Sequence, residues 1–261
     1  MRGGVLLVGA MGVPQRFYSA LAAWLAEQGY LTVTFDFGGI GESRDQPLKS
    51  FATDILTWGR VECPVVLDFL HQQAGDLPLF WLAHSLGGQI FPLAHNRHLI
   101  RRMIAVATGS GYWGYYNPPL RYYSWWLWHV LVPVAVRLTG YFPGQRLRKL
   151  SDLPAGVIRQ WRRWCLDPEY LLGVEGPAVV SAFQSVTQPV TFISLSDDEY
   201  LSHRSTEKLL ACFNNASVNH LHVDPVDFGL QSIGHFGFFK SPAKEHLWRT
   251  VLLPELQVGD G

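Results

Sequence analysis

The chain has 261 residues, which is enough for one large domain or for a domain with an insertion. Lysine plus arginine equals aspartate plus glutamate at 21 each, so no overall field attracts nucleic acid or an anionic membrane surface. The cysteines are far apart and odd in number, which indicates neither a disulfide framework nor a zinc site and favours a reducing compartment. They are Cys63, Cys165 and Cys212.

The N-terminus enters a strand-like run almost at once. Residues 5–8 are apolar and come too early for a signal-peptide core followed by a cleavage site. With the cysteine content, this favours a cytoplasmic protein. From Phe17 onward, apolar side chains recur about every 3.6 positions until Gly29, which predicts an amphipathic helix that ends at this glycine.

Short apolar runs alternate with helical patterns before residue 110 and again after residue 176. A further helix is predicted near residues 65–71, with Pro64 at or near its first turn. Such alternation is typical of a mostly parallel sheet that helices cover on both faces, and so predicts an α/β fold. The predicted strands are residues 5–8, 31–35, 79–83, 103–107, 190–195 and 218–223.

The middle of the chain interrupts this alternation. Residues 112–170 hold six of the ten tryptophans and seven of the ten tyrosines. We interpret residues 112–175 as an inserted helical, aromatic-rich cap (lid), and residues 1–111 and 176–261 as the two parts of the core domain. Most of these aromatic side chains are expected to pack the cap onto the core, and a few to line an acyl pocket. Within the cap, residues 122–136 carry no Asp, Glu, Lys or Arg, but this stretch contains a proline and falls short of the ~20 residues that span a bilayer, so we expect no transmembrane segment.

A serine between small residues ends the apolar run that precedes residue 85. Ser85 lies two positions after Ala83 and two before Gly87, and a sharp strand-to-helix turn tolerates only small side chains there. Such a turn exposes Ser85 as a nucleophile at the end of a strand. Leu86 then begins the next helix, with its N–H where an acyl oxyanion would form. A glycine-rich loop with an ordinary serine is the alternative.

A serine hydroxyl needs a base within hydrogen-bond reach, and the base needs an acceptor that holds its tautomer. His235 is the candidate base, because it lies in a short loop between Gly234 and Gly237 after the last predicted strand. His84 is next to Ser85 but is expected to point the other way along the strand. Other histidines have no comparable setting, among them His95, His98, His220 and His222.

An acidic turn follows the predicted strand at residues 190–195, at the edge where sites in such sheets collect. We assign Asp198 as the acid that orients His235, because its distance along the chain from the strand fits the fold better than that of Asp197. Asp197 stays as the alternative. Glu199 is expected to be solvated.

The loop after the first predicted strand, residues 9–14, is rich in small residues that let the backbone approach a substrate. We assign the N–H of Met11 as the second donor of an oxyanion hole, beside that of Leu86. Ala10 is the alternative to Met11, and an ordinary glycine-rich turn would produce the same pattern.

In combination, these residues resemble the α/β-hydrolase superfamily, whose nucleophile, acid and histidine follow in the chain order of Ser85, Asp198 and His235. Residues 35–43, Phe-Asp-Phe-Gly-Gly-Ile-Gly-Glu-Ser, are similar to the superfamily's Asp-Tyr/Phe-Arg-Gly-x-Gly-x-Ser turn. The resemblance implies an α/β-hydrolase fold over nearly the whole chain. Four further segments are similar to a bacterial branch of hydrolases nearest the monoglyceride-lipase and serine-aminopeptidase type: residues 9–13, 109–113, 140–143 and 234–239.

The chain departs from the superfamily's pattern in three ways. Ala83 opens the serine turn where glycine is usual, and Gly38 stands where arginine is usual. The sequence also begins at what resembles the third strand of the fold, since the first two strands have no counterpart upstream of Val5. An exposed strand edge favours association. Our hypothesis is therefore that the protein forms a homo-oligomer through this edge, or that a partner covers it.

Together, the residues and the resemblance predict a serine hydrolase that cleaves a small-molecule carboxylic ester through an acyl-enzyme, with no metal and no organic cofactor. The aromatic cap favours an apolar or medium-chain acyl group. An acyltransferase with the same triad is the nearest alternative, and a non-catalytic ligand-binding protein of the same fold is a further one. A peptidase ranks lower, because no acidic cluster for a substrate amino terminus is evident among Asp152, Asp167 and Glu169.

Overall fold

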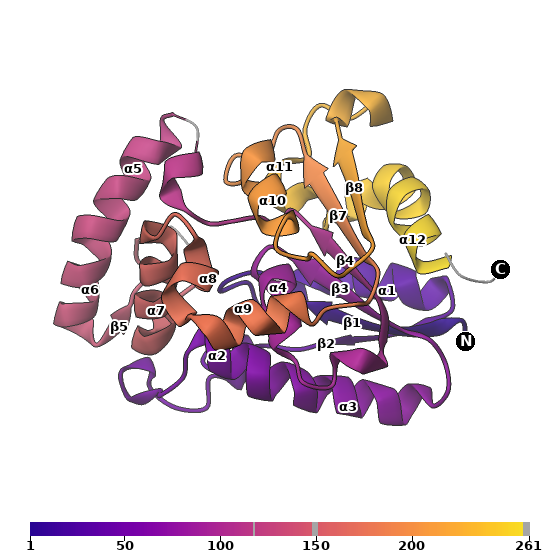
Figure 1. The fold of residues 1–261 in the computed structure, drawn as a ribbon, viewed down its shortest axis with the longest axis horizontal. Helices are drawn as coiled ribbons and strands as arrows, with labels where there is room; N and C mark the ends of the chain where they lie inside the picture. Colours follow the sequence, from indigo (N-terminus) through magenta and orange to yellow (C-terminus); the bar gives the residue numbers. More distant parts are fainter. Residues whose placement is uncertain (117, 148–150, 258–261) are drawn as a thin grey trace.

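A computed structural model describes residues 1–116, 118–147 and 151–257, and Figure 1 shows their fold. Its centre is a six-stranded sheet of order β2-β1-β3-β4-β7-β8, in which every neighbouring pair runs parallel. The predicted α/β class and all six predicted strands are confirmed. The strands are β1 (Gly3–Val8), β2 (Tyr30–Thr34), β3 (Leu79–His84), β4 (Ile100–Val106), β7 (Val190–Leu195) and β8 (Val218–Val223).

Both predicted helices before residue 80 are present. The amphipathic segment after residue 17 forms α1 (Ser19–Glu27), and Pro64 lies in the first turn of α3 (Cys63–Ala74), directly after a π-helical turn of residues 58–62. The other α-helices are α2 (Ile55–Thr57), α4 (Leu86–Gln89), α5 (Leu120–Trp126), α6 (Val132–Thr139), α7 (Ala155–Leu166), α8 (Tyr170–Glu175), α9 (Pro177–Gln184), α10 (His203–Leu210), α11 (Gly234–Gly237) and α12 (Leu253–Gln257).

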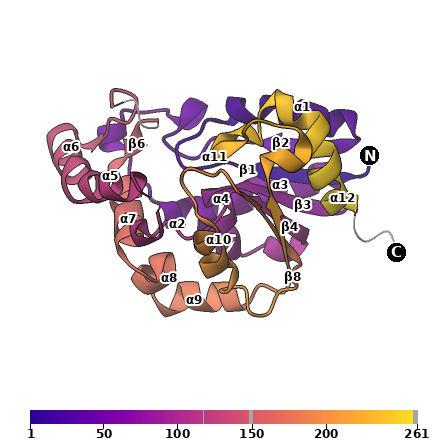
Figure 2. The ribbon, with the colours of Figure 1, turned by 90° about the horizontal axis from the view of Figure 1, so that it is seen from above.

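Side chains of each strand alternate between two hydrophobic layers, one on each face of the sheet. In β1, Leu6 and Val8 belong to the layer that includes residues of α3, α9 and α10, whereas Val5 and Leu7 belong to the layer of α1 and α12. Figure 2 shows α1 and α12 on one side of the sheet and α9 and α10 on the other. Because both faces are covered, β1, β3 and β7 are buried along their whole length, which explains their unbroken apolar sequences.

Between β4 and β7, the chain leaves the sheet and forms α5 to α9 with a short antiparallel pair, β5 (Tyr141–Phe142) and β6 (Leu153–Pro154). In Figure 1, α5, α6 and α7 stand together at one end of the molecule. The bounds of the inserted cap, residues 112–175, stay a prediction. No helix within the described ranges is long and apolar enough to cross a membrane.

The aromatic side chains of this segment divide between its interior and its surface. Trp128 and Trp164 are buried, as the sequence predicts. As expected, most of the tryptophan and tyrosine side chains in residues 112–170 are buried or half-buried. Tyr122, Trp125 and Trp126, all on α5, are exposed. The outer face of α5 is therefore apolar in a way that the sequence pattern did not reveal.

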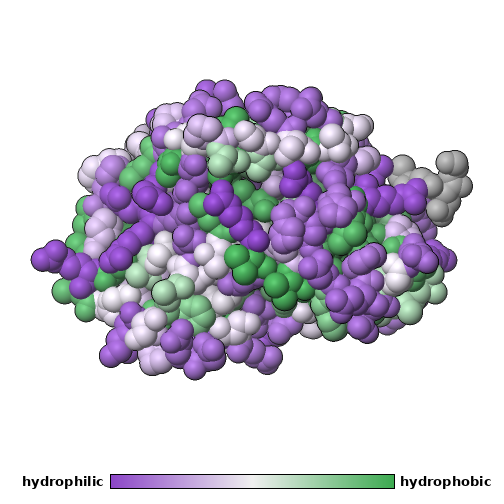
Figure 3. Space-filling model, turned by 60° about the horizontal axis from the view of Figure 1, so that its bottom comes forward, coloured by the Kyte–Doolittle hydropathy of each residue, from purple (hydrophilic) through white to green (hydrophobic). Residues whose placement is uncertain are grey.

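The rest of the surface mixes hydrophilic and hydrophobic side chains. Figure 3 brings the side of the molecule with α3 forward and shows hydrophobic residues at the surface among hydrophilic ones. Val61, Val65 and Phe69 are exposed there at four-residue spacing, on α3 and just before it. They form a narrow apolar stripe on the outer side of the helix.

Strand order reverses between β1 and β3. From β1 the chain moves outward to β2, returns to β3 on the other side of β1, and continues outward through β4, β7 and β8. Loops at the carboxyl ends of two such strands part and leave a crevice, which is where open α/β sheets bind ligands. The loop after β1 and the turn after β3 meet at this point.

Candidate active site

Ser85 lies in the turn between β3 and α4, at the carboxyl end of the strand. Its φ of 53° and ψ of −109° place it in a region that residues other than glycine rarely occupy. The Ser85 N–H donates to the Val106 carbonyl at 3.0 Å, and the Ser85 carbonyl accepts from Thr108 Oγ1 at 3.0 Å. Both bonds tie this strained turn to β4 and the loop that follows it.

Gly87 is required by the close approach of the turn to β1. A Cβ atom at this position would lie 2.3 Å from the Val8 carbonyl oxygen, which is backbone and cannot give way cheaply. The small residue that the sequence places two positions after Ser85 therefore allows α4 to begin directly against β1. This brings Ser85 beside the loop that follows β1.

His235 lies on the short helix α11, and its ring is held by Asp198. Nδ1 of His235 is 2.8 Å from Oδ2 of Asp198, and the Asp198 side chain is only 2% exposed. The other Asp198 oxygen accepts the N–H groups of Tyr200 and Leu201 at 2.8 and 2.9 Å. Because a carboxylate only accepts, Nδ1 carries the proton and Nε2 is the basic nitrogen. Ser85 and His235 line the same cavity.

The two acids beside Asp198 hold the backbone around His235. Asp197 Oδ2 accepts the N–H groups of Ile233 and Gly234 at 2.8 and 3.0 Å, and Glu199 Oε2 accepts that of His235 at 2.9 Å. Asp197 therefore does not contact the imidazole, which supports Asp198 over Asp197 as the orienting acid. Glu199 is exposed, as expected of a solvated acid, and it additionally holds the backbone of His235.

His84 contacts the His235 loop, contrary to the expectation that it points away from the site. Side-chain alternation in β3 does turn it to the face opposite Ala83, but α11 lies on that face, and the rings of His84 and His235 are 5.1 Å apart. Nε2 of His84 donates to the His235 carbonyl at 3.0 Å. Nδ1 lies 2.9 Å from Oη of Tyr18, which in turn accepts the N–H of Ala10 at 2.8 Å.

This arrangement defines the protonation of His84. The Tyr18 hydroxyl accepts from Ala10, so its proton is available to Nδ1, and the carbonyl of His235 needs a proton on Nε2. His84 is fully buried, and burial is the main reason that its pKa lies well below the ordinary value. The ring is therefore a neutral link between the loop after β1 and the His235 loop.

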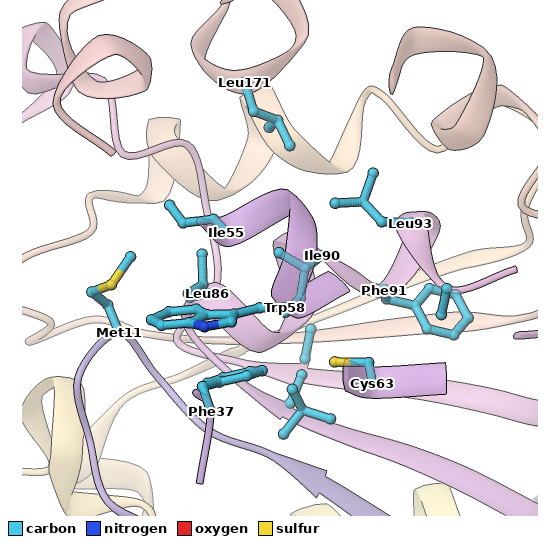
Figure 4. Close-up of a cluster of buried hydrophobic side chains, with 14 of the residues drawn as sticks. Met11, Phe37, Ile55, Trp58, Cys63, Leu86, Ile90, Phe91, Leu93 and Leu171 are labelled. Carbon is cyan, nitrogen blue, oxygen red and sulfur yellow. The ribbon is translucent and has the colours of Figure 1, made fainter. Parts of the chain in front are cut away.

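Met11 and Leu86 line the same cavity as Ser85. Their side chains belong to the hydrophobic core around Trp58, which Figure 4 shows. The Ala10 N–H is engaged by Tyr18, so the structure favours Met11 over Ala10 as a donor toward the cavity. The indole of Trp58 stacks on the ring of Phe37, with the two ring centroids 4.6 Å apart, so Trp58 is a rigid support for this core.

The cavity at Ser85 has a volume of about 510 Å³ and lies between the sheet and the segment that carries α5 to α8. Among the described residues that line it, none is Asp, Glu, Lys or Arg. Its polar lining residues include Ser85, Gln89 and His235, and also Ser124 and Ser151, whereas much of the remaining wall is aliphatic or aromatic. That wall includes Leu120, Leu127, Trp128, Phe142, Ile158 and Trp161.

Sequence reasoning missed three parts of this site. Tyr18 and His84 are buried polar residues with no motif, and Glu199 is an exposed acid like many others. His95 and His98 are exposed away from the cavity lining, as the sequence analysis expects. His220 and His222 lie on β8, also apart from it.

A nucleophile turn after a central parallel strand, with a histidine and an acid on later loops, defines the α/β-hydrolases, and the chain is a member of that superfamily. More narrowly, residues 1–160 match the family model of the S33 serine aminopeptidases, and the chain belongs to this family. A comparison with curated proteins found no match.

Solved structures with a similar fold include two monoglyceride lipases and a mouse protein named for its α/β-hydrolase domain. A monoacylglycerol lipase of Paleococcus ferrophilus is 15% identical, with a TM-score of 0.61 over 98% of this chain and 94% of that one. A soluble variant of the Saccharomyces cerevisiae monoglyceride lipase, in complex with a substrate analogue, is 17% identical, with a TM-score of 0.60 over 86% and 78%. Mouse α/β-hydrolase domain-containing protein 10 is 17% identical, with a TM-score of 0.56 over 97% and 90%. At such identities the likeness shows the fold.

Proposed function

We propose that this protein is a serine hydrolase that cleaves carboxylic esters through an acyl-enzyme. Oγ of Ser85 attacks the ester carbonyl while Nε2 of His235 takes its proton, and the imidazolium then protonates the leaving alcohol. A water molecule that gives its proton to His235 next attacks the acyl group and releases a carboxylic acid and free Ser85. The 2.8 Å contact between Asp198 and Nδ1 supports these roles, since it leaves Nε2 as the base.

The N–H groups of Met11 and Leu86 are the proposed oxyanion donors. Leu86 is the first residue of α4, where a helix N–H has no partner within the helix. Met11 lies in the loop after β1, on the other wall of the cavity. Two donors preset around the developing negative charge stabilise the tetrahedral intermediate without reorganisation.

The uncharged lining of the cavity is the observation that carries the substrate class. An apolar acyl chain gains from leaving water for such a wall, whereas a charged group would lose its hydration there without a partner. We therefore propose esters of apolar, medium-length acyl groups as substrates.

The same lining argues against an aminopeptidase activity, despite the name of the family. A peptidase that trims amino termini needs an acceptor for the substrate ammonium group, and no described cavity residue is a carboxylate. Glu175, an acid that the sequence analysis did not count, accepts from Gln160 and Trp164 at 2.9 and 2.7 Å. Its carboxylate is thus used within the segment between β4 and β7.

The rate of ester hydrolysis by the Ser85→Ala variant, compared with that of wild type, tests the proposal. We expect turnover of p-nitrophenyl octanoate to fall by at least about a thousandfold, while Ser181→Ala, an exposed serine of α9, keeps wild-type activity. Equal turnover by Ser85→Ala and wild type would refute the nucleophile. Product analysis with added alcohol separates hydrolysis from acyl transfer, since an ester product forms only if the alcohol resolves the acyl-enzyme.

A further inference from the structure

Three histidines outside the active site converge at the far edge of the sheet. One ring nitrogen from each of His203, His220 and His222 lies within 4.8 Å of those of the other two. Oγ of Ser194 is 2.8 Å from Nε2 of His220 and 2.8 Å from Nδ1 of His222, so these two nitrogens point at one place.

Strand register and helix placement bring the rings together. In the parallel pair of β7 and β8, His222 lies beside Ser194, and His220 lies two positions earlier on the same face. That face is the one against which α10 packs, and His203 is the first residue of α10. In Figure 1, α10 lies beside the ends of β7 and β8.

We propose that His203, His220 and His222 bind one divalent transition-metal ion, with Zn²⁺ as the best fit. Neutral imidazole is a preferred ligand of zinc and of its first-row neighbours. Tetrahedral zinc with Zn–N of about 2.0–2.1 Å spaces its ligand nitrogens about 3.4 Å apart. The present spread of 4.8 Å closes by rotation of His203 and His222, whose side chains are exposed.

The surroundings of the cluster favour a bound cation. His220 is half-buried, so its ring is partly shielded from water, which favours the neutral imidazole that ligates metal. Oε1 of Glu207 lies 3.2 Å from Nε2 of His203, so a carboxylate orients this ring and offsets the positive end of α10.

A bound ion would join α10 to the outer strand β8 close to the catalytic acid. His203 follows Asp198 by five residues, and Leu201 between them lines the substrate cavity. Ligand binding to the folded state raises the unfolding temperature. The site would therefore stabilise the segment that carries Asp198 without taking part in the chemistry.

Titration with Co²⁺, a spectroscopic substitute for zinc, tests the site on protein that carries no histidine tag. We expect one equivalent of Co²⁺ to give a saturable visible absorption band that Zn²⁺ abolishes, and Zn²⁺ to raise the unfolding temperature. Separate His203→Ala and His222→Ala variants, both at exposed positions, should weaken binding by about tenfold or more.

His95→Ala removes an exposed histidine elsewhere and should bind as wild type does. Circular dichroism of each variant shows whether the fold is kept. Absence of a saturable band in wild type, or equal affinity in wild type and both folded cluster variants, would overturn the proposal. Ester hydrolysis by Ser85 is independent of this outcome.

Discussion

Nε2 of His84 donates a hydrogen bond to the backbone carbonyl of His235, so the residue before the proposed nucleophile holds the loop of the proposed base. On its other side, His84 is linked through Tyr18 to the N–H of Ala10, next to the proposed oxyanion donor Met11. One buried ring therefore couples the three loops on which the proposed chemistry depends. Its effect is on the position of His235, since the bond is made to backbone.

Replacing His84 tests this positioning role. His84→Phe leaves the Tyr18 hydroxyl and the His235 carbonyl buried without their partner, and an unpaired buried group costs about 1–3 kcal/mol. We expect kcat to fall by about tenfold or more with little change in KM. His84→Gln, which can both accept from Tyr18 and donate to His235, should recover most of the loss. A Phe variant with wild-type kcat would show that the link has no role in catalysis.

The same residue predicts how stability depends on pH. The pKa of His84 lies well below its ordinary value of 6.5 in the folded chain, so below about pH 6.5 the unfolded chain binds a proton that the folded chain does not. Stability contributed by neutral His84 is complete above that range and is lost as pH falls, by at most about 1.4 kcal/mol per pH unit.

Thermal unfolding of wild type and His84→Gln between pH 8 and pH 5.5 measures this dependence. Other histidines titrate in both proteins, so the difference between the two curves reports His84. The wild-type unfolding temperature should fall more steeply below pH 6.5. Parallel curves would contradict a depressed pKa at this residue.

Asparagine substitutions distinguish the two neighbouring acids. Both oxygens of Asp198 accept hydrogen bonds. In Asp198→Asn, the amide nitrogen would face a donor in either position, so the side chain would no longer hold His235 in the tautomer with its proton on Nδ1. Asp198→Asn should lower kcat by about 10³–10⁴-fold.

Asp197→Asn is the matched control. Oδ2 of Asp197 accepts two backbone N–H groups and Oδ1 has no described partner, so an asparagine keeps both bonds with its oxygen in the Oδ2 position. We expect less than about a tenfold change in kcat. A larger loss in Asp197→Asn than in Asp198→Asn would reverse the assignment.

Gly87→Ala tests the close contact that forms the serine turn. The added Cβ would lie 2.3 Å from the Val8 carbonyl oxygen, and the forced shift should destabilise the fold by about 1–3 kcal/mol. In Gly237→Ala, the added Cβ would lie 3.6 Å from its nearest neighbour, so this variant should be at least as stable as wild type. Denaturant unfolding of the two variants compares them directly, and equal stability would contradict the packing argument.

Narrowing the cavity should change the preferred acyl chain. Leu127 is half-buried in the cavity wall, and Leu127→Trp fills space that a longer acyl chain would use. We expect kcat/KM for octanoate esters to fall at least about fivefold more than for butyrate esters. Val130→Trp, three positions on and exposed, should leave the ratio unchanged. Equal losses of kcat/KM for the octanoate and butyrate esters would show that the acyl chain does not bind beside Leu127.

Much of the fold and of the candidate site could be predicted because both leave local sequence signals. Buried parallel strands are continuous apolar runs, and a serine turn needs small residues at fixed spacing, as at Ala83 and Gly87. Strand alternation also predicts the face on which His84 lies. It does not reveal what covers that face, which is why the contact with His235 could not be foreseen.

The remaining features depend on the packing of distant segments. Glu199 binds the His235 backbone only because two loops meet, and its exposure is like that of any solvated acid. His220 and His222 share a strand face by period, but His203 joins them through the placement of α10 against β7 and β8. No spacing in the sequence distinguishes such a cluster.

The most direct test of the proposed chemistry is the site of covalent labelling by a fluorophosphonate, which reacts with a serine only when a base activates it. Mass spectrometry of the intact protein should show one adduct per chain, and peptide mapping should place it on Ser85. Ser85→Ala should not be labelled, and Ser181→Ala should be labelled as wild type is. Undiminished labelling of Ser85→Ala, or an adduct mapped to another residue, would contradict the assignment of Ser85 as the nucleophile.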